Sequence, residues 1–193
     1  MLSPALYASA IESTDDELVA RAREGDRAAM NALLGRHYDR LYAICHRIAG
    51  NPADAADGCQ EALLAIVRGL DRFDGRSTFS TWSYRVATNA CLDEMRRKNR
   101  SPLPVEEVAE RHESGPGLAQ QVTDRVTLDA VLPRLPEEFR VPVVLRDVAG
   151  LDYGEIAETL QIPPGTVRSR IARGRRQLAQ LLGNQVPPSG RQR

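Results

Sequence analysis

The stretch LDYGEIAETLQIPPGTVRSRIARGRRQL, residues 151–178, decides the fold of the C-terminal part of this chain. Residues 151–160 have the apolar spacing of a short helix, residues 161–163 form a tight turn, and a longer helix opens at Pro164 or Gly165. The buried stripe of the short helix holds Ile156, Ala157 and Leu160. Two helices joined by such a turn are typical of the helix-turn-helix, whose second helix lies in the major groove of DNA.

The longer helix has two different faces when 100° is allowed per residue. One apolar stripe holds Val167, Ile171, Gly174, Leu178, Leu181 and Leu182. The opposite face holds Ser169, Ala172, Arg173 and Arg176, with Arg168 at its edge. No acidic residue occurs from Pro164 to the end of the sequence. Because arginine can bind guanine or phosphate through two parallel N–H groups, this face favours DNA contact over the alternative, a solvated basic face on an ordinary bundle helix.

Upstream of this motif, apolar residues recur at helical steps, and no stretch alternates as a strand does. A capping box made by Thr14 and Glu17 starts the first helix, and Gly25 ends it. Further helices are predicted up to Gly50, over 53–70 and over 79–99, with a glycine-bearing loop at 73–78. The sequence therefore predicts an all-α protein.

Composition changes in the middle of the chain. Prolines and glycines interrupt any helix between residues 101 and 123, and apolar residues are sparse there. This segment reads as a flexible acidic linker, so we expect two small helical domains. The predicted parts are an N-terminal extension (1–13), a first domain (14–100), the linker (101–123), a second domain (124–183) and a disordered tail (184–193).

The net charge of the 193 residues is zero, because 26 Lys and Arg balance 26 Asp and Glu. A neutral chain argues against nucleic-acid binding only if its charge is evenly spread. Here residues 1–100 are neutral, the linker carries four acidic residues against one basic, and residues 124–193 carry eleven basic against eight acidic. All basic residues except Lys98 are arginines. Selection for phosphate binding and a codon usage rich in GC explain this excess of arginine equally well.

The predicted helix over residues 53–70 carries a polar stripe opposite its apolar one. The stripe, within about 60° of Asp57, holds Asp57, Gln60, Glu61, Leu64 and Arg68. Leu64 is its one apolar member. A single exposed leucine is common, and a polar stripe around a leucine also suits a protein–protein contact. The residues alone leave both interpretations open.

Residues 73–100 combine a polar loop with aromatic and basic side chains. Aromatic residues beside basic ones can stack on unpaired bases and hold phosphates. We expect Trp82 and Tyr84 in the core, whereas Phe73 and the loop are placed to touch a base. The basic cluster at 96–100 is either a phosphate contact or a solvated helix C-terminus that the helix dipole favours.

Several protein classes are excluded by what the sequence lacks. No apolar run approaches the roughly 18 residues of a membrane span, and the N-terminus does not resemble a secretory signal. No phosphate-binding, dinucleotide-binding, serine-hydrolase or metalloprotease motif occurs, so we expect neither enzyme activity nor a cofactor. Cys45, Cys59 and Cys91 form no metal-binding pattern and read as core thiols in a reducing cytoplasm.

Taken together, these segments resemble the extracytoplasmic-function (ECF) group of the bacterial sigma-70 family over nearly the whole chain. The motifs that carry the resemblance are Asp57-x-x-Gln60-Glu61-Ala62, Phe79-x-x-Trp82-x-Tyr84-Arg85-x-Ala87-x-Asn89, Leu135-Pro136, Arg146-Asp147-x-x-Gly150-Leu151, Ile156-Ala157 and Gly165-Thr166-Val167-Arg168-Ser169-Arg170. Each motif alone is modest evidence, whereas the ordered set is highly specific.

The resemblance implies an alternative sigma factor, without catalysis of its own, that directs RNA polymerase to promoters and helps to melt them, as in stress responses. Contact with the β′ clamp helices of core RNA polymerase is implied for Asp57, Gln60, Glu61, Leu64 and Arg68. Recognition of the −10 element, by capture of a flipped base, is implied for Phe73, Asp74, Gly75, Arg76, Ser77, Thr78, Asn89, Arg96 and Arg97. Recognition of the −35 element is implied for Thr166, Arg168, Ser169, Ala172, Arg173 and Arg176.

Two protein partners also follow from the resemblance. The second domain is expected to meet the β flap of the polymerase. An anti-sigma factor is expected to hold the chain inactive, in the cytoplasm or at the membrane. The alternative class is a DNA-binding response regulator, which would need an α/β receiver with buried strands ahead of the linker. The first 100 residues show only helical periodicity, which favours the sigma factor.

Overall fold

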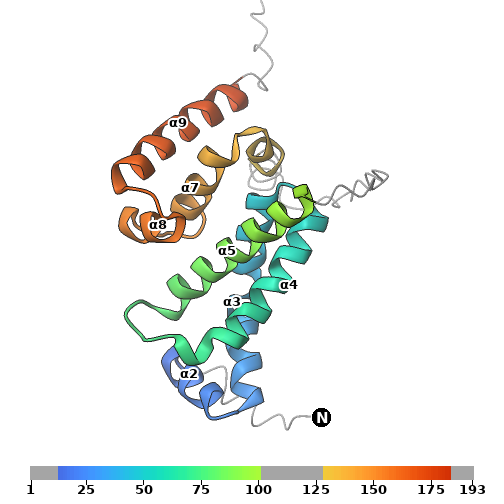
Figure 1. Cartoon of the computed structure of the whole chain (residues 1–193), viewed down its shortest axis with the longest axis vertical. Coiled ribbons are helices and arrows are strands. Elements are labelled where there is room, and N and C mark those ends of the chain that lie inside the picture. The colour runs from blue at the N-terminus through green and yellow to red at the C-terminus, as the bar shows by residue number, and fades with distance from the viewer. Residues whose placement is uncertain (1–12, 101–127, 184–193) are drawn as a thin grey trace, which may run out of the picture.

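The computed structural model describes residues 13–100 and 128–183, and all regular structure in these two ranges is helical (Figure 1). The prediction of an all-α protein is therefore confirmed. The helices form two groups, which correspond to the two predicted domains (Figure 1). The predicted linker (101–123), tail (184–193) and most of the N-terminal extension lie outside the described residues.

The first group is an assembly of four helices: α2 (Asp15–Arg23), α3 (Arg27–Ala49), α4 (Pro52–Gly69) and α5 (Phe79–Arg100). The capping box predicted at Thr14 is present, with its hydroxyl accepting from Glu17 N–H and Glu17 bonding back to Thr14 N–H. Asp26 caps α3 by accepting two backbone N–H groups, those of Ala28 and Ala29. Local sequence thus sets where these helices begin.

Helix α4 packs closely on α5 because it carries glycines where the two helices meet. A Cβ on Gly58 would lie 3.2 Å from Cys91 Cα, and one on Gly69 would lie 3.3 Å from the Trp82 ring. The short 3-10 turn η1 (Leu70–Arg72) then leads from α4 into the loop before α5. This packing fixes the direction of the polar stripe on α4.

The three cysteines are core thiols, as predicted, and they lie together between α3, α4 and α5. Cys45, Cys59 and Cys91 are all buried, and the Cys91 thiol lies 3.7 Å from the Cys45 carbonyl oxygen. Hydrogen bonding to the Cys59 and Cys91 thiols, together with burial, raises the pKa of Cys45. Cys45 is therefore a protonated packing group at neutral pH.

The second group contains the predicted helix-turn-helix. It comprises η2 (Leu132–Arg134), α7 (Glu137–Asp147), α8 (Tyr153–Leu160) and α9 (Pro164–Gly183). Asp152 caps α8 in a capping box with Glu155, so α8 begins two residues later than the apolar pattern suggested. Gln161 adopts a left-handed conformation (φ 53°), which ends α8 and turns the chain into α9.

The two groups touch along one side of the molecule (Figure 1). Arg47 of α3 pairs with Asp129 at 2.9 Å, and Arg85 of α5 pairs with Glu158 of α8 at 3.1 Å. Pro133 packs against the turn at Gly50. Helix α3 also contacts α7, so the apolar cores of the two groups are continuous. None of the described helices is long and apolar enough to cross a membrane.

Candidate nucleic-acid and protein interfaces

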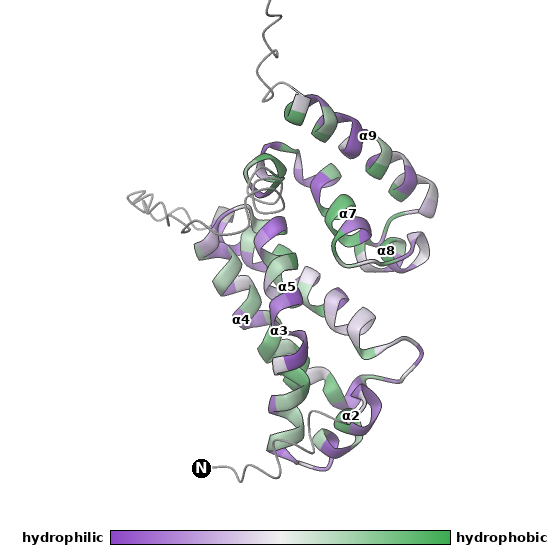
Figure 2. Ribbon diagram, turned by 180° about the vertical axis from the view of Figure 1, so that it is seen from behind, coloured by the Kyte–Doolittle hydropathy of each residue, from purple (hydrophilic) through white to green (hydrophobic). Residues whose placement is uncertain are grey.

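The outer face of α9 presents the residues that the sequence assigned to DNA. Arg168, Ser169, Ala172, Arg173 and Arg176 are exposed, and Thr166 is half-buried. Figure 2 shows hydrophilic and hydrophobic residues alternating along this helix. The apolar stripe faces inward, with Val167, Ile171, Gly174 and Leu178 buried. The predicted separation of the two faces is confirmed.

The five arginines of α9 differ in their partners. Arg170 pairs with Glu138 of α7 at 3.6 Å, and Arg175 makes a two-bond contact with Asp147, in which its Nε lies 3.1 Å from Oδ2. The hydrogen bond to Asp147 raises the pKa of Arg175. Among the described residues, no carboxylate pairs with the other three arginines, Arg168, Arg173 and Arg176.

This difference divides α9 into a side paired with α7 and an exposed side, the predicted reading face. Arg170 and Arg175 hold α9 against α7 through acidic residues of the same domain. Because no carboxylate in residues 13–100 and 128–183 pairs with Arg168, Arg173 or Arg176, their N–H groups can donate to an acceptor outside these ranges. The hydroxyl of Ser169 donates to the Thr166 carbonyl oxygen at 3.0 Å, so its free lone pairs can accept but its hydrogen is engaged.

On α4, every member of the predicted stripe is at the surface. Asp57, Gln60, Glu61, Leu64 and Arg68 are all exposed. Leu64 is 40% exposed, which confirms the prediction that an apolar side chain interrupts the polar stripe. Beside the stripe, a hollow between α4 and α5 is lined by Glu61 and Arg68 from α4 and by Asp93, Glu94 and Arg97 from α5.

Two large apolar residues besides Leu64 are exposed on α3 and α4, which the sequence did not predict. The exposed large hydrophobic side chains of the described residues are Tyr38, Leu64 and Val67. Tyr38 lies about 18 Å from Gly50 along α3, and Leu64 lies about 20 Å from Asn51 along α4, at 1.5 Å per residue. Because α3 and α4 pack side by side as an antiparallel pair, Tyr38 and Leu64 lie at similar heights along the two helices.

Helical periodicity places Val67 in the apolar stripe of α4 that faces the core, and its 44% exposure corrects that expectation. Tyr38 was not singled out, because periodicity does not distinguish an apolar side chain at the edge of a buried stripe from one inside it. Tyr38 also stacks on Tyr42, with ring centroids 6.3 Å apart, and Tyr42 stacks on His46 at 6.0 Å. These stacked rings form an aromatic edge along α3. On α4 itself, Leu64 and Val67 with the charged stripe form a mixed polar and apolar surface of the kind that proteins use to bind one another.

The loop before α5 is exposed at its tip but not at its start. Asp74, Gly75, Arg76 and Thr78 are exposed and Ser77 is half-buried. Phe73 is only 5% exposed, which corrects the expectation that it touches a base. Its ring packs against Phe79 and Trp82, with centroids 6.0 and 5.3 Å away. Burying this large apolar ring stabilises the base of the loop instead.

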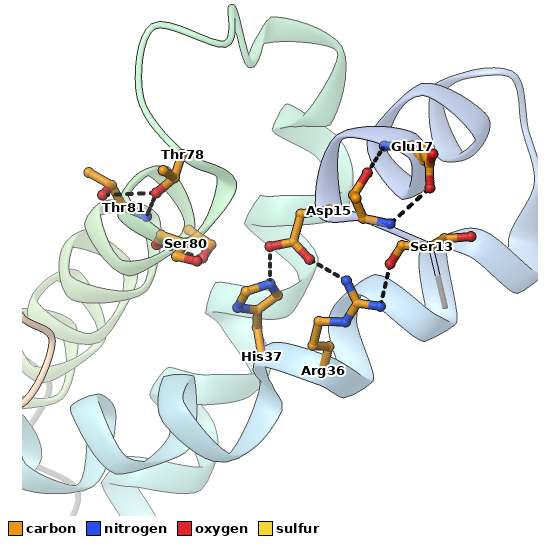
Figure 3. Close-up of polar contacts among 10 residues, drawn as sticks. Ser13, Asp15, Glu17, Arg36, His37, Thr78, Ser80 and Thr81 are labelled. Carbon is orange, nitrogen blue, oxygen red and sulfur yellow. Dashed lines mark hydrogen bonds and ion pairs between the residues drawn. The ribbon is translucent and has the colours of Figure 1, made fainter. Parts of the chain in front are cut away.

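Arg23 of α2 fixes the start of the loop. Its guanidinium donates to the carbonyl oxygens of Leu70 and Phe73 and lies over the Phe73 ring, 5.9 Å from the centroid. The end of the loop is fixed by Thr78, whose hydroxyl accepts from Thr81 N–H at 3.2 Å at the start of α5 (Figure 3). Thr78 thus has a capping role that sequence reasoning did not assign to it.

Helix α2 is itself held beside the loop through Asp15 (Figure 3). The Asp15 carboxylate lies 2.8 Å from His37 Nε2 and 2.7 Å from Arg36 Nη1, both on α3. His37 is buried, and its ring lies 5.1 Å from that of Phe79, the first residue of α5. The loop therefore begins and ends beside a packed junction of α2, α3 and α5.

The structure divides the predicted −10 residues between two places. Asn89 and Arg96 are exposed and lie two turns apart on one face of α5. Arg97 belongs to another face, where it pairs with Glu94 at 2.8 Å and lines the hollow beside Glu61 and Arg68. Arg97 thus lies beside the α4 stripe rather than beside the loop, which is at the other end of α5 (Figure 1).

One residue on the Asn89 face was missed. Arg85 lies one turn before Asn89, and its side chain is one-third exposed. It pairs with Glu158 of α8, so the second domain covers part of this face. Arg96 similarly pairs with Asp93 at 3.2 Å. Both pairs are at the surface and weak, so a phosphate could replace the carboxylates.

Comparison with known proteins bears on all of these surfaces. The Sigma-70 region 2 family model matches residues 33–101, and the Sigma-70 region 4 model matches residues 125–178. The ECF RNA polymerase sigma factor SigM of Mycobacterium tuberculosis is 37% identical over 176 residues, which cover 89% of this chain and 86% of that relative. The ECF RNA polymerase sigma-E factor of Escherichia coli K12 is 35% identical over 189 residues, 91% of this chain and 95% of that relative.

This chain belongs to the ECF sigma factors. The predicted resemblance is thereby confirmed, and the response-regulator alternative is wrong. In this sigma factor the region 2 match contains α4, α5 and the loop between them, and the region 4 match contains α7 and α8 with α9 as far as Leu178.

The sigma factor also shares its fold with solved structures. CnrH, determined in complex with the cytosolic domain of CnrY, superposes with a TM-score of 0.64 at 24% identity over 89% of this chain and 99% of that one. The sigma factor RpoE of Bartonella quintana, determined with the anti-sigma factor NepR, gives 0.61 at 22% identity over 79% and 96%. The described helical groups thus have the sigma-factor arrangement.

Proposed function

We propose that this sigma factor binds core RNA polymerase through α4 and directs it to promoters by reading the −35 element with α9 and the −10 element with residues 74–78 and α5. As an ECF sigma factor it acts in promoter-directed initiation of transcription. In this proposal its described residues recognise the promoter and bind the polymerase, and the polymerase supplies the catalysis.

The observation that carries this proposal is the set of unpaired arginines on α9. Arg170 and Arg175 are engaged by acidic residues of α7. Arg168, Arg173 and Arg176 instead share an exposed face with Ser169 and Ala172, in the second helix of a helix-turn-helix. Arginine donors beside a small residue suit base edges and phosphates in a major groove.

For docking on the polymerase, the support is the α4 stripe with its apolar members. Leu64 and Val67 are exposed on the same helix as Asp57, Gln60, Glu61 and Arg68. An apolar centre with a charged rim is the usual anatomy of a protein interface, with the apolar side chains supplying affinity. We assign this surface to the β′ clamp helices, and the second domain to the β flap.

For the −10 element, the support is a rigid loop with a polar, exposed tip. Asp74 accepts from Arg76 N–H at 3.1 Å, which shapes the tip, and Gly75 has φ of 72°, a conformation that favours glycine. Such a tip can close around a base that has left the DNA stack. Asn89 and Arg96 would then follow the strand along α5.

The remaining assignments concern the setting in which the factor works. We place it in the cytoplasm with an anti-sigma factor as its inhibitory partner. The two sigma domains pack on each other through the ion pairs Arg47–Asp129 and Arg85–Glu158. An inhibitor that binds this packed arrangement would keep the two domains together. The domain boundaries 14–100 and 124–183 are part of the same proposal.

Run-off transcription tests the proposal as a whole. Purified full-length chain is added to core RNA polymerase on a promoter library randomised at the −35 and −10 elements. Enrichment of one −35 and one −10 sequence, absent with core enzyme alone, is the expected result. Transcripts whose start sites do not depend on the added chain would contradict it.

A further inference from the structure

We propose that Tyr153, the first residue of α8, is a positioning residue that aims Arg168 at the −35 element and so determines specificity there. This inference rests on the proposed function of α9. It concerns a residue outside the reading face, on the preceding helix, that neither the sequence motifs nor the exposed arginines pointed to.

Two guanidinium groups lie over the Tyr153 ring. Arg168 Cζ of α9 is 5.8 Å from the ring centroid, and Arg146 Cζ of α7 is 5.1 Å from it. Both distances are within the range in which a cation is attracted to the electron-rich face of an aromatic ring. One tyrosine therefore joins α7, α8 and α9.

The ring is itself held in place. Tyr153 follows the Asp152–Glu155 capping box, which fixes the first turn of α8, and its side chain packs against the apolar core. Arg146 donates from Nη1 to the Leu151 carbonyl oxygen at 2.8 Å, which fixes the loop just before the cap. Tyr153 is thus a rigid support and not a mobile surface ring.

Arg168 depends on this support more than its neighbours on α9 do. Arg170 and Arg175 are fixed by carboxylates, whereas no carboxylate of the described chain pairs with Arg168. Within the described residues, its guanidinium is supported by the Tyr153 ring alone. Since Arg168 lies near the N-terminal end of α9, where recognition helices contact base edges, its direction decides which base it meets.

Holding a long side chain in its bound direction reduces the entropy that binding must remove. A cation–π contact at an exposed site corresponds to a change of about two- to five-fold in affinity. We therefore expect Tyr153→Leu to weaken binding by about this factor at the preferred −35 sequence, and to change little at sequences that Arg168 does not select. Tyr153→Phe keeps the ring face and should behave as the wild type.

The experiment uses the full chain bound to core polymerase and a promoter duplex library randomised across the −35 element. Wild type, Tyr153→Leu, Tyr153→Phe, Arg168→Ala and the Tyr153→Leu/Arg168→Ala double variant are compared. The expected result is loss of preference at the same base position in Tyr153→Leu and Arg168→Ala, no further loss in the double variant, and rescue in Tyr153→Phe.

A second measurement separates positioning from folding. In the free protein, the NMR shifts of the Arg168 side chain should move in Tyr153→Leu and not in Tyr153→Phe, since the ring current is lost only in the former. A uniform loss of affinity on all −35 sequences, or additive losses in the double variant, would overturn the role of Tyr153. If Arg168→Ala leaves the −35 preference unchanged, then the proposed reading by Arg168 fails as well, and the two failures are distinct.

Discussion

Lys98 of α5 holds Asp57 of α4, with its Nζ 2.8 Å from Asp57 Oδ2, and it also contacts the carboxylate of Asp54. These contacts join the last turns of α5 to the first turns of α4. Asp57 therefore has a partner within the chain, although it belongs to the stripe that we assign to polymerase. Its side chain is still 53% exposed, so a second partner can reach the same carboxylate.

Replacing Lys98 tests how much this contact contributes to the fold. Lys98→Met keeps the length of the side chain and removes its charge, and Lys98→Arg is the control that keeps the charge. Because Lys98 is partly exposed and screened, we expect Lys98→Met to lower the free energy of unfolding by less than about 1 kcal/mol. Urea titration should show this loss of unfolding free energy in Lys98→Met at low salt and much less of it at high salt. An equal loss at low and at high salt would show that packing, not charge, is responsible.

The same pair predicts a pH dependence. Hydrogen bonds with Asp54 and Asp57 raise the pKa of Lys98, so its contribution to stability is complete below about pH 10 and is lost as the pH rises through the raised value. Desolvation opposes the shift at Asp54, but hydrogen bonds from Lys98 and Asn51 lower its pKa. Its contribution is complete above about pH 4 and is lost as the pH falls further.

The stability difference between wild type and Lys98→Met should therefore form a plateau between about pH 4 and about pH 10. Urea titrations across the pH range measure it, with Lys98→Arg as the charge-preserving reference. A difference that changed steeply near pH 7 would contradict the assignment to these two groups.

Leu64 is the residue that best tests the docking surface. Leu64→Glu places a carboxylate at the apolar centre of the α4 stripe, and since the side chain is already 40% exposed the fold should be retained. Apolar residues at interface centres commonly account for more than 1 kcal/mol, so we expect core polymerase to be bound about tenfold more weakly. Ala20→Glu, at an exposed position of α2, is the matched control. Co-purification with core enzyme at unchanged yield would argue against docking through α4.

The two kinds of arginine on α9 give a paired test. Arg173→Ala should cost about 1–3 kcal/mol at the preferred −35 sequence if it makes a two-bond base contact. Arg175→Ala, which removes an arginine already paired with Asp147, should leave the sequence preference unchanged. Binding assays of the polymerase complex on −35 variants measure both. An equal loss for Arg173→Ala on every sequence would identify a phosphate contact instead.

The helix-turn-helix and the α4 stripe were predictable because each lies on one helix, where spacing alone assigns the faces. Phe73 was placed wrongly because a loop position was taken to mean exposure. Its neighbours in space, Phe79 and Trp82, turn this loop residue into core. Membership of a loop says little about an aromatic side chain, because burying the ring is favourable wherever a surface can cover it.

Contacts between distant parts of the chain were beyond sequence reasoning. Lys98 and Asp57 are 41 residues apart, and Arg85 meets Glu158 across the two domains. No periodicity within a helix encodes such pairs, since they depend on how the helices pack. The capping role of Thr78 was readable in principle, because threonine directly before the first residue of a helix is a preferred N-cap.

Gly174 gives a final test, of how α9 is seated on α7. A Cβ at this position would lie 2.8 Å from Val143 Cγ2 and 3.1 Å from the Phe139 carbonyl oxygen, both too close for an unshifted structure. Alanine in a helix interior gains up to about 1 kcal/mol over glycine, but overpacking a tight contact costs about 1–3 kcal/mol. We therefore expect Gly174→Ala to destabilise the second domain.

The matched control is Gly35→Ala, in the interior of α3, where no atom outside its own helix lies within 4 Å of the added Cβ. It should gain the helix propensity without the clash, so thermal unfolding should move in opposite directions for the two variants. Promoter binding by Gly174→Ala should also fall, because the reading face is oriented by the contact between α9 and α7. A stability gain for Gly174→Ala equal to that of Gly35→Ala would mean that α9 can move away from α7 at little cost, and the reading face would then not be rigidly placed.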